Sequence, residues 1–307
     1  MIATREAYGK ALVELGEKNK NVVVLDADLA KATKTDGFMK AFPDRFFDMG
    51  IAEADMIGTA AGLATCGKIP FASSFAMFAI GRAYDQVRNS IAYPKLNVKI
   101  AATHAGITVG EDGATHQAIE DIALTRVMPN MTVLCPCDEF ETKWAIETSA
   151  EIDGPVYIRL GRSKAKEVYN EEESFEFGKG KLVRDGNDVT VIATGIMVAE
   201  AVKAHEILKD EGISVRVIDI HTIKPIDKDI IIKAAYETKG IVTAEEHSII
   251  GGLGGAVSEV ISEKCPTKVL RVGVKDVFGK SGAASELLKE YGLTAENIIE
   301  RVREILK

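Results

Sequence analysis

Short apolar runs rich in β-branched residues alternate with helical patterns along almost the whole chain, and this alternation constrains the fold more than any other feature. In the first half we expect strands near residues 22–25, 46–49, 69–72, 98–102, 131–134 and 156–160. In the second half we expect them near residues 189–193, 215–218, 241–244 and 269–272. Strands that alternate with helices form parallel sheets covered by helices, so the pattern predicts an α/β fold.

The alternation lapses between Lys164 and about Asp188, where the chain is polar and contains glycine. Such a lapse is typical of a boundary between domains. We therefore expect two open, mainly parallel-sheet domains over residues 1–165 and 187–307, joined by a linker over residues 166–186. A chain of 307 residues with 46% hydrophobic residues can fill two cores.

The composition excludes several classes of function. A net charge of −8 without a Lys/Arg cluster argues against a nucleic-acid surface. The amino terminus lacks a secretory signal and no segment approaches the length of an uncharged apolar membrane span, so we expect a cytoplasmic protein that does not bind membranes. The four cysteines lack the spacing of a zinc or redox motif and are predicted to be buried thiols; they are Cys66, Cys135, Cys137 and Cys265.

The densest polar cluster lies between Thr103 and Asp121, where T-H-A-G-I-T-V-G-E-D-G-A-T-H-Q-A-I-E-D contains two of the five histidines. A solvated loop is the structural alternative, but further candidate residues also follow predicted strands. Together these residues are Asp26, Asp28, Glu53, Phe75, Phe78, His104, Asp112, His116 and Arg162. Each residue taken singly could have a purely structural role, because an acid stabilises the start of a helix and an aromatic residue commonly lies in a core. Because parallel strands end at one edge of a sheet, we expect them all to meet on one rim.

Several motifs together resemble the pyrimidine-binding domain of the transketolase family. They are G-I-A-E-A-D-M, P-F-A-S-S-F-A-M-F with R-A-Y-D-Q-V-R, A-T-H-A-G-I-T-V-G-E-D-G-A-T-H-Q and L-G-R-S. In the second half, V-I-D-I-H-T-I-K-P-I-D and E-E-H-S-I-I-G-G-L-G-G are similar to the carboxyl-terminal domain of that family. The resemblance covers the whole chain and implies an enzyme that uses thiamine diphosphate.

On the cofactor side, the resemblance implies that Glu53 is a catalytic residue that hydrogen-bonds the aminopyrimidine ring and favours its imino form. Phe75 and Phe78 match the aromatic residues around that ring, with Phe78 the better candidate for stacking. Asp28 matches an acid near the cofactor and the subunit contact. The phosphate-loop serine of the family aligns with Ala32 or Thr33, so this chain lacks that residue.

On the substrate side, the resemblance implies that His116 acts near the reacting carbonyl and that Asp112 binds a sugar hydroxyl. A carboxylate only accepts hydrogen bonds, whereas an imidazole can donate, accept or transfer a proton. Arg5, His104 and Arg162 match the cationic group that binds a sugar phosphate, and arginine suits phosphate oxygens because of its forked donors.

The chain lacks the G-D-G motif and following asparagine that hold the divalent cation in this family, so we expect no metal ligands here. The resemblance instead implies a separate amino-terminal subunit that holds Mg²⁺ or Ca²⁺ and the diphosphate. The Met1 start favours a separately encoded subunit over a truncated protein. Because the cofactor would lie at an interface, we also expect self-association into at least a dimer.

The sequence therefore predicts a transketolase subunit that moves a two-carbon ketol unit between ketose and aldose phosphates. The nearest alternative is a beta subunit of a 2-oxoacid dehydrogenase or a relative of deoxyxylulose phosphate synthase, either of which would release carbon dioxide. The complete G-E-D-G-A-T-H-Q run and His104 weigh against that alternative, because a sugar phosphate gives these polar groups a ligand. A further alternative is a non-catalytic subunit that assembles or regulates another enzyme.

Overall fold

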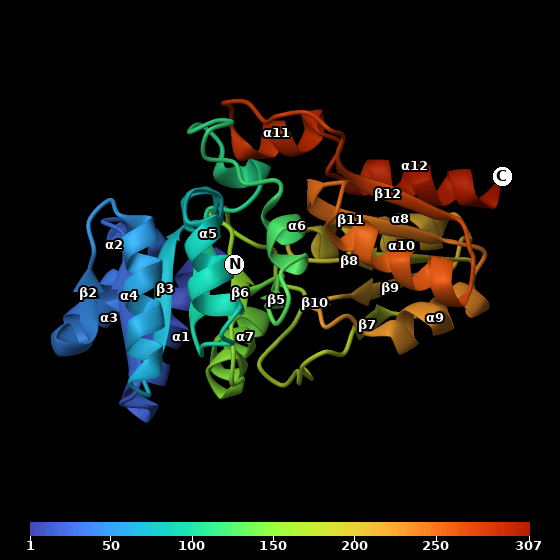
Figure 1. Cartoon of the computed structure of the whole chain (residues 1–307). Helices are drawn as coiled ribbons and strands as arrows, with labels where there is room; N and C mark the ends of the chain where they lie inside the picture. The colour runs from blue at the N-terminus through green and yellow to red at the C-terminus, as the bar shows by residue number, and fades with distance from the viewer.

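The computed structural model describes all residues, 1–307, as two sheets that lie side by side and are covered by helices (Figure 1). The first sheet has seven strands in the order β10-β5-β6-β4-β3-β1-β2. They are β1 (Val22–Asp26), β2 (Phe46–Asp48), β3 (Ile69–Phe75), β4 (Lys99–Thr103), β5 (Thr132–Leu134), β6 (Val156–Arg159) and β10 (Thr222–Lys224). All neighbours in this sheet are parallel except β10 and β5.

The second sheet has five strands in the order β12-β11-β8-β9-β7. They are β7 (Lys181–Arg184), β8 (Val189–Ala193), β9 (Val215–Asp219), β11 (Ile241–Ser248) and β12 (Val269–Val274). Only β7 runs antiparallel to its neighbour. The α/β fold class with mainly parallel sheets is thus confirmed.

All ten strands that the alternation predicts are present, and two further strands are not predicted. β7 lies within residues 166–186 and pairs with β9, so part of the expected linker belongs to the second sheet. β10 follows β9 in the chain but pairs with β5 of the first sheet. The second half of the chain therefore supplies an edge strand to the sheet of the first half.

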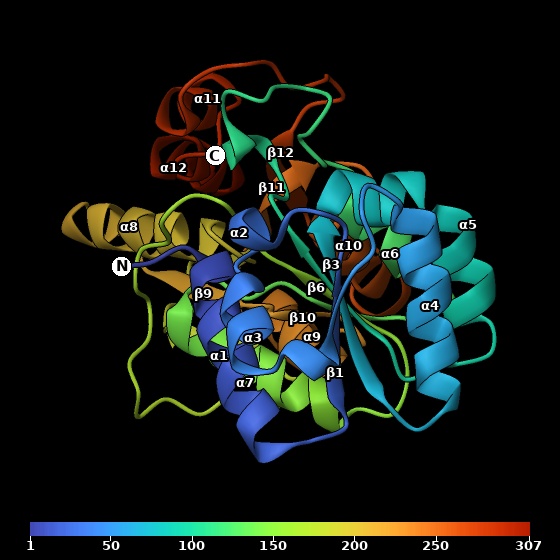
Figure 2. The same ribbon diagram turned by 90° about the vertical axis from the view of Figure 1, so that its left-hand side faces the viewer.

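Helices cover both faces of each sheet (Figures 1 and 2). The first half contains α1 (Thr4–Lys18), α2 (Ala30–Thr33), α3 (Asp36–Ala41), α4 (Glu53–Thr65), α5 (Tyr84–Gln86), α6 (Asp121–Arg126) and α7 (Glu139–Glu151). It also has short turns at η1 (Pro43–Arg45) and η4 (Ile107–Val109), and wider π-helical turns at η2 (Met77–Arg82) and η3 (Val87–Ala92). The second half contains α8 (Met197–Asp210), α9 (Lys228–Glu237), α10 (Leu253–Lys264), α11 (Ala284–Glu290) and α12 (Ala295–Leu306).

The central strands are apolar on both faces because helices cover both faces. β1 is V-V-V-L-D, and all five of its residues are buried, as expected of a strand inside a parallel sheet. One apolar core lies between the first sheet and the α1 and α7 helices, for example around Tyr8 and Ile146. A second core extends from α4 of the first half to α10 of the second half, as Met56 and Val257 show. The two halves therefore share a continuous apolar core.

The expectation of buried cysteine thiols is correct for three of the four. Three of the cysteines are buried thiols, but Cys66 is exposed, because it lies in the turn just after α4. The glycine-rich run at 251–255 begins α10, where the Glu245 carboxylate accepts hydrogen bonds from the backbone N–H groups of Leu253 (2.7 Å) and Gly254 (2.8 Å). A Cβ atom on Gly252 would collide with that carboxylate. No helix combines the length and the apolar character needed to cross a bilayer.

Candidate active site

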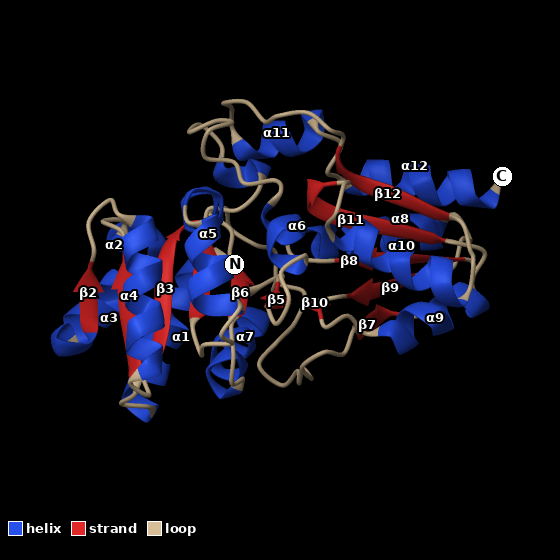
Figure 3. Ribbon diagram, viewed as in Figure 1, coloured by secondary structure: helices blue, strands red, loops and turns tan.

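The candidate residues lie where the strands of the first sheet end. Glu53 is the first residue of α4, Phe75 is the last residue of β3, and His104 directly follows β4. Phe78 lies in η2, and His116 lies in the loop after η4. Figure 3 shows this loop beside α11, at the edge of the first sheet that faces the top of the view.

Four aromatic side chains form the centre of the site. The rings of Phe75 and His104 are stacked, with centroids 3.7 Å apart, and the Phe75 and Phe78 rings are stacked at 5.9 Å. His116 presents its edge to Phe78 at 5.2 Å. The structure thus brings together aromatic residues that belong to two separate motifs in the sequence.

Glu53 is linked to the aromatic side chains by Arg82, which is not among the predicted site residues. Its carboxylate Oε2 accepts a hydrogen bond of 2.8 Å from the Arg82 guanidinium, and the Cζ atom of Arg82 lies 4.6 Å from the centroid of the Phe78 ring. The Glu53 side chain is only 2% exposed, whereas that of Arg82 is 52% exposed. No role was expected for Arg82 from the sequence, although it begins the R-A-Y-D-Q-V-R motif four residues after Phe78.

We expect His104 to be a neutral imidazole in the free chain. Burial, together with the nearby Arg5 and Arg162 guanidinium groups, lowers the pKa of His104 to about 3. Arg5 NH1 donates to His104 Nε2 at 3.1 Å, so the ring proton belongs on Nδ1, which donates to Thr103 Oγ1 at 2.9 Å. The positive charge beside His104 therefore comes from the Arg5 and Arg162 guanidinium groups, and the assignment of these three residues to a sugar phosphate stays a prediction.

The backbone at His104 is left-handed, with a φ of 56°. A residue other than glycine rarely adopts this conformation, and such strain is found mainly at functional sites. Here the conformation accompanies two contacts of the ring, the stacking on Phe75 and the hydrogen bond from Arg5.

The second half of the chain holds the histidine-containing loop in place. Glu246, on β11, accepts a hydrogen bond of 2.6 Å from the backbone N–H of Thr108. The side-chain amide of Gln117 donates to the carbonyls of Ile107 (3.1 Å) and Lys280 (3.0 Å). Gly106 has a φ of 84°, and a Cβ atom there would collide with the Glu246 carboxylate, so this close approach requires glycine.

Arg162 borders the same loop, while two other candidates lie outside the cluster. Arg162 NH1 donates to the Val109 carbonyl and bonds Glu111 Oε2 at 2.9 Å. The Asp112 side chain is exposed and makes no hydrogen bond. Asp28, with a φ of 61°, lies on the turn after β1, where its N–H donates to Asp48. The structure thus brings neither Asp28 nor Asp112 into contact with the aromatic group.

The turn after β1 contains Ala32 and Thr33, the residues that align with the phosphate-loop serine of the family. Thr33 is fully buried, and its hydroxyl donates to Asp26 Oδ2 at 2.7 Å. Thr35 donates to the same oxygen at 2.8 Å. Ala32 offers only its backbone carbonyl, which accepts from Arg5 at 2.8 Å. The two threonine hydroxyls therefore satisfy a buried carboxylate of this chain rather than face the site.

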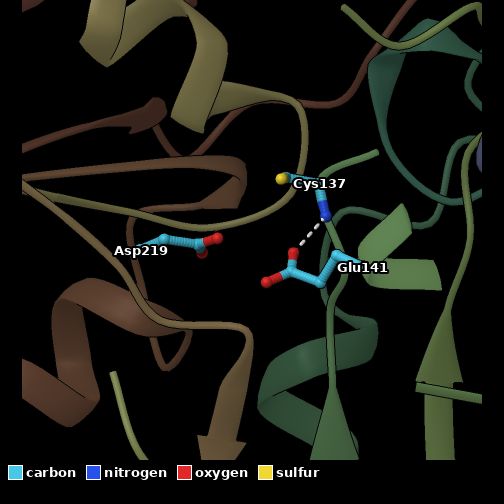
Figure 4. A group of neighbouring side chains, drawn as sticks. All are labelled: Cys137, Glu141 and Asp219. Atoms are coloured by element: carbon cyan, nitrogen blue, oxygen red, sulfur yellow. Dashed lines mark hydrogen bonds between the residues drawn. The ribbon is translucent and has the colours of Figure 1, made fainter. Parts of the chain in front are cut away.

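A separate buried polar group lies between the two halves of the chain and consists of Cys137, Glu141 and Asp219 (Figure 4). One carboxyl oxygen of Glu141 and one of Asp219 have no hydrogen-bond donor. Burial, and then the neighbouring Asp219, raise the pKa of Glu141 well above its usual range, and burial also raises the pKa of Asp219. We infer that the two carboxyl groups share a proton, which would satisfy both oxygens.

The shared proton makes stability depend on pH. Because both carboxyl pKa values are raised by folding, the folded chain binds more protons than the unfolded chain above about pH 4, and stability falls as the pH rises. We expect Glu141→Gln to reduce this fall between pH 5 and 8 by up to about 1.4 kcal/mol per pH unit, since its amide donates to Asp219 without titrating. Urea unfolding at several pH values measures the effect. Glu151→Gln, at the exposed end of α7, is the control, and an equal pH slope for both variants and the wild type would contradict the prediction.

Comparisons with known proteins agree with this architecture. Residues 1–167 match the pyrimidine-binding domain of transketolase, and residues 178–298 match the transketolase C-terminal domain. The chain is 59% identical over 306 residues to a protein of Methanocaldococcus jannaschii described as a transketolase C-terminal section, covering 99% of this chain and 96% of that protein. It is 45% identical to the 6-deoxy-6-sulfo-D-fructose transketolase subunit of Clostridium sp. (strain MSTE9), covering 98% of this chain and 94% of that protein.

A solved structure described as a split gene transketolase, inactive beta4 tetramer, superposes with a TM-score of 0.94 at 58% identity, covering 100% of this chain and 99% of that one. Matches to the longer transketolases of rat and human cover 99% of this chain but only 49% of those proteins. The domain matches, the identities and the shared fold lead to one conclusion: this chain belongs to the transketolase family and contains its pyrimidine-binding and C-terminal domains.

Proposed function

We propose that this chain is the carboxyl-terminal subunit of a split transketolase, which transfers a two-carbon ketol unit between ketose and aldose phosphates. The observation that carries the proposal is the meeting of Glu53, Phe78, His104 and His116 at one rim of the first sheet. The names of similar proteins support the substrate class, because 6-deoxy-6-sulfo-D-fructose and apulose 4-phosphate are both sugars with an anionic group.

The residues at the rim fit the aminopyrimidine of thiamine diphosphate. Glu53 offers a buried carboxyl group for a ring nitrogen, and Phe78 offers an aromatic face beside it. When bound, thiamine diphosphate supplies the nucleophilic carbon of the reaction. In this proposal Glu53 holds the proton shared with the ring nitrogen, and Phe75 and Phe78 keep water away from the ring. Asp28 remains a candidate for the subunit contact.

On the substrate side we assign proton transfer at the sugar carbonyl and hydroxyl groups to His116, which lies half-buried beside Phe78. Asp112 is exposed on the same loop and would accept a hydrogen bond from a sugar hydroxyl. Arg5 contacts His104, Arg162 lies near enough to lower its pKa, and both arginines would bind the phosphate.

We further propose that a separate amino-terminal subunit holds Mg²⁺ or Ca²⁺ and the diphosphate of the cofactor. The absence of a G-D-G motif and the half-length match to the longer transketolases support a missing metal-binding part. The inactive tetramer formed by the similar split-gene chain supports self-association and the need for a partner. Similarity to transketolases at 39–59% identity favours this proposal over a 2-oxoacid dehydrogenase subunit.

The role of Arg162 tests the proposal in the reconstituted complex. With xylulose 5-phosphate as donor, we expect Arg162→Ala to raise KM by about tenfold or more with little change in kcat, because a charged hydrogen bond contributes about 1.5–3 kcal/mol. With erythrulose, a ketose without phosphate, KM should not change. Lys164→Ala removes an exposed cation two residues away and is the control. Turnover of pyruvate in place of xylulose phosphate would instead favour the 2-oxoacid enzymes.

A further inference from the structure

We propose that Arg82 is a placeholder for the aminopyrimidine ring. In the free chain its guanidinium group occupies the place of the ring between Glu53 and Phe78, and cofactor binding displaces it. This inference rests on the proposed function, because it takes Glu53 and Phe78 as the residues that hold the ring.

Arg82 makes both of the contacts that the ring would require. It donates to Glu53 Oε2 at 2.8 Å, and its Cζ atom lies 4.6 Å from the centroid of the Phe78 ring. A guanidinium group is planar, donates hydrogen bonds at its edge and stacks through its face. The aminopyrimidine is also flat, and it would use the same carboxyl oxygen and the same aromatic face. The two groups therefore exclude each other.

Arg82 is much more exposed than Glu53, as expected of a side chain that a ligand displaces from a fixed carboxylate. Glu53 is 2% exposed and is fixed at the start of α4, whereas Arg82 is 52% exposed. Arg82 makes no other side-chain hydrogen bond or ion pair. Its long side chain can rotate into solvent while Glu53 stays in place.

The local backbone places Arg82 at this position. Arg82 is the last residue of the π-helical turn η2, and Ala83 then interrupts the helix with a φ of −102° and a ψ of 20°. Single π-helical turns are rare and occur frequently at functional sites. This turn carries Phe78 and Arg82 with the guanidinium group over the ring.

The placeholder has two opposite energetic effects. In the free chain Arg82 neutralises a buried carboxylate that would otherwise lack a partner, so it stabilises the fold. In the assembled enzyme it competes with the cofactor, and the apparent dissociation constant rises because only the fraction of molecules with Arg82 displaced can bind. Removal of the guanidinium group should therefore weaken the fold and tighten cofactor binding.

The test is Arg82→Met, which keeps the apolar stem and removes the guanidinium group. In the complex reconstituted with the amino-terminal subunit and Mg²⁺, we expect calorimetric titration with thiamine diphosphate to give a Kd about five- to tenfold lower than that of the wild type. We also expect urea to unfold the free variant at a lower concentration. Arg82→Lys, which keeps the charge without the planar fork, should give an intermediate Kd, and it serves as the test if Arg82→Met fails to fold. Arg88→Met is the control, because Arg88 lies on the next turn and bonds only Asn89.

An unchanged or higher Kd for the Arg82 variants would overturn the placeholder, and a higher value would mean that Arg82 helps to hold the cofactor. Phe78→Leu and Glu53→Gln separate this outcome from failure of the proposed function. Both should weaken cofactor binding if the rim holds the aminopyrimidine, whatever Arg82 does. If neither variant changes the Kd, the assignment of the site is at fault.

Discussion

Replacement of Glu53 by glutamine is expected to lower kcat for ketol transfer in the reconstituted complex by about 10²–10⁴-fold, the range that a positioned acid or base contributes. Glutamine has the shape of glutamate and can still accept the hydrogen bond from Arg82, but it cannot share a proton with the cofactor ring. Because Glu53 lies at the first turn of α4 without another side-chain partner, the fold should remain intact. A coupled assay of ketol transfer and the thermal midpoint of the complex measure the two effects.

The matched control for Glu53 is Asp55→Asn, because Asp55 is an exposed acid on the same helical turn. It should leave both kcat and the thermal midpoint unchanged. Wild-type turnover by a folded Glu53→Gln complex would remove the central assignment of the site.

Replacement of Arg159 by methionine is expected to have the largest effect on stability, a loss of about 3–5 kcal/mol, because it leaves a buried charge without its partner. Arg159 Nε donates to Asp121 Oδ2 at 2.8 Å, and the Tyr157 hydroxyl donates to the same oxygen at 2.6 Å. Arg159 also donates to the Glu246 carbonyl at 2.8 Å and so joins the first sheet to the second. The free energy of unfolding in urea measures the loss.

Two further variants identify the cause of this loss. Arg159→Met combined with Asp121→Asn removes both charges and should regain a large part of the lost stability. Arg303→Met breaks an exposed ion pair with Glu211 and should cost no more than about 1 kcal/mol. If Arg159→Met were no more harmful than Arg303→Met, the buried network would not hold the two halves together.

The sequence predicted strands wherever apolar residues form a run, including the exposed edge strand β2, whose sequence is F-F-D. All ten of these strands are present, and the central ones are apolar on both faces because helices cover both faces. β7 and β10 were not predicted because neither forms a long enough apolar run. β7 is a half-exposed edge strand, and β10 contains only three residues, of which Thr222 and Lys224 are polar. Their pairing depends on neighbours distant in the sequence.

The rim of the candidate site was predictable because the carboxyl ends of parallel strands share one edge of a sheet. This geometry brought Glu53, Phe75 and His104 to the same place from three separate motifs. The charge of His104 was not predictable, because its pKa depends on burial and on the approach of Arg5 and Arg162.

The sequence alone determined the α/β architecture, ten of the twelve strands and the order in which candidate residues follow them, because periodicity and strand polarity are local properties. Only the tertiary structure decided how these residues are supported. It paired Arg82 with Glu53, made His104 neutral and placed Glu246 under the histidine-containing loop. These features are contacts between segments far apart in the chain, and their strength depends on distance and burial, which sequence spacing does not encode.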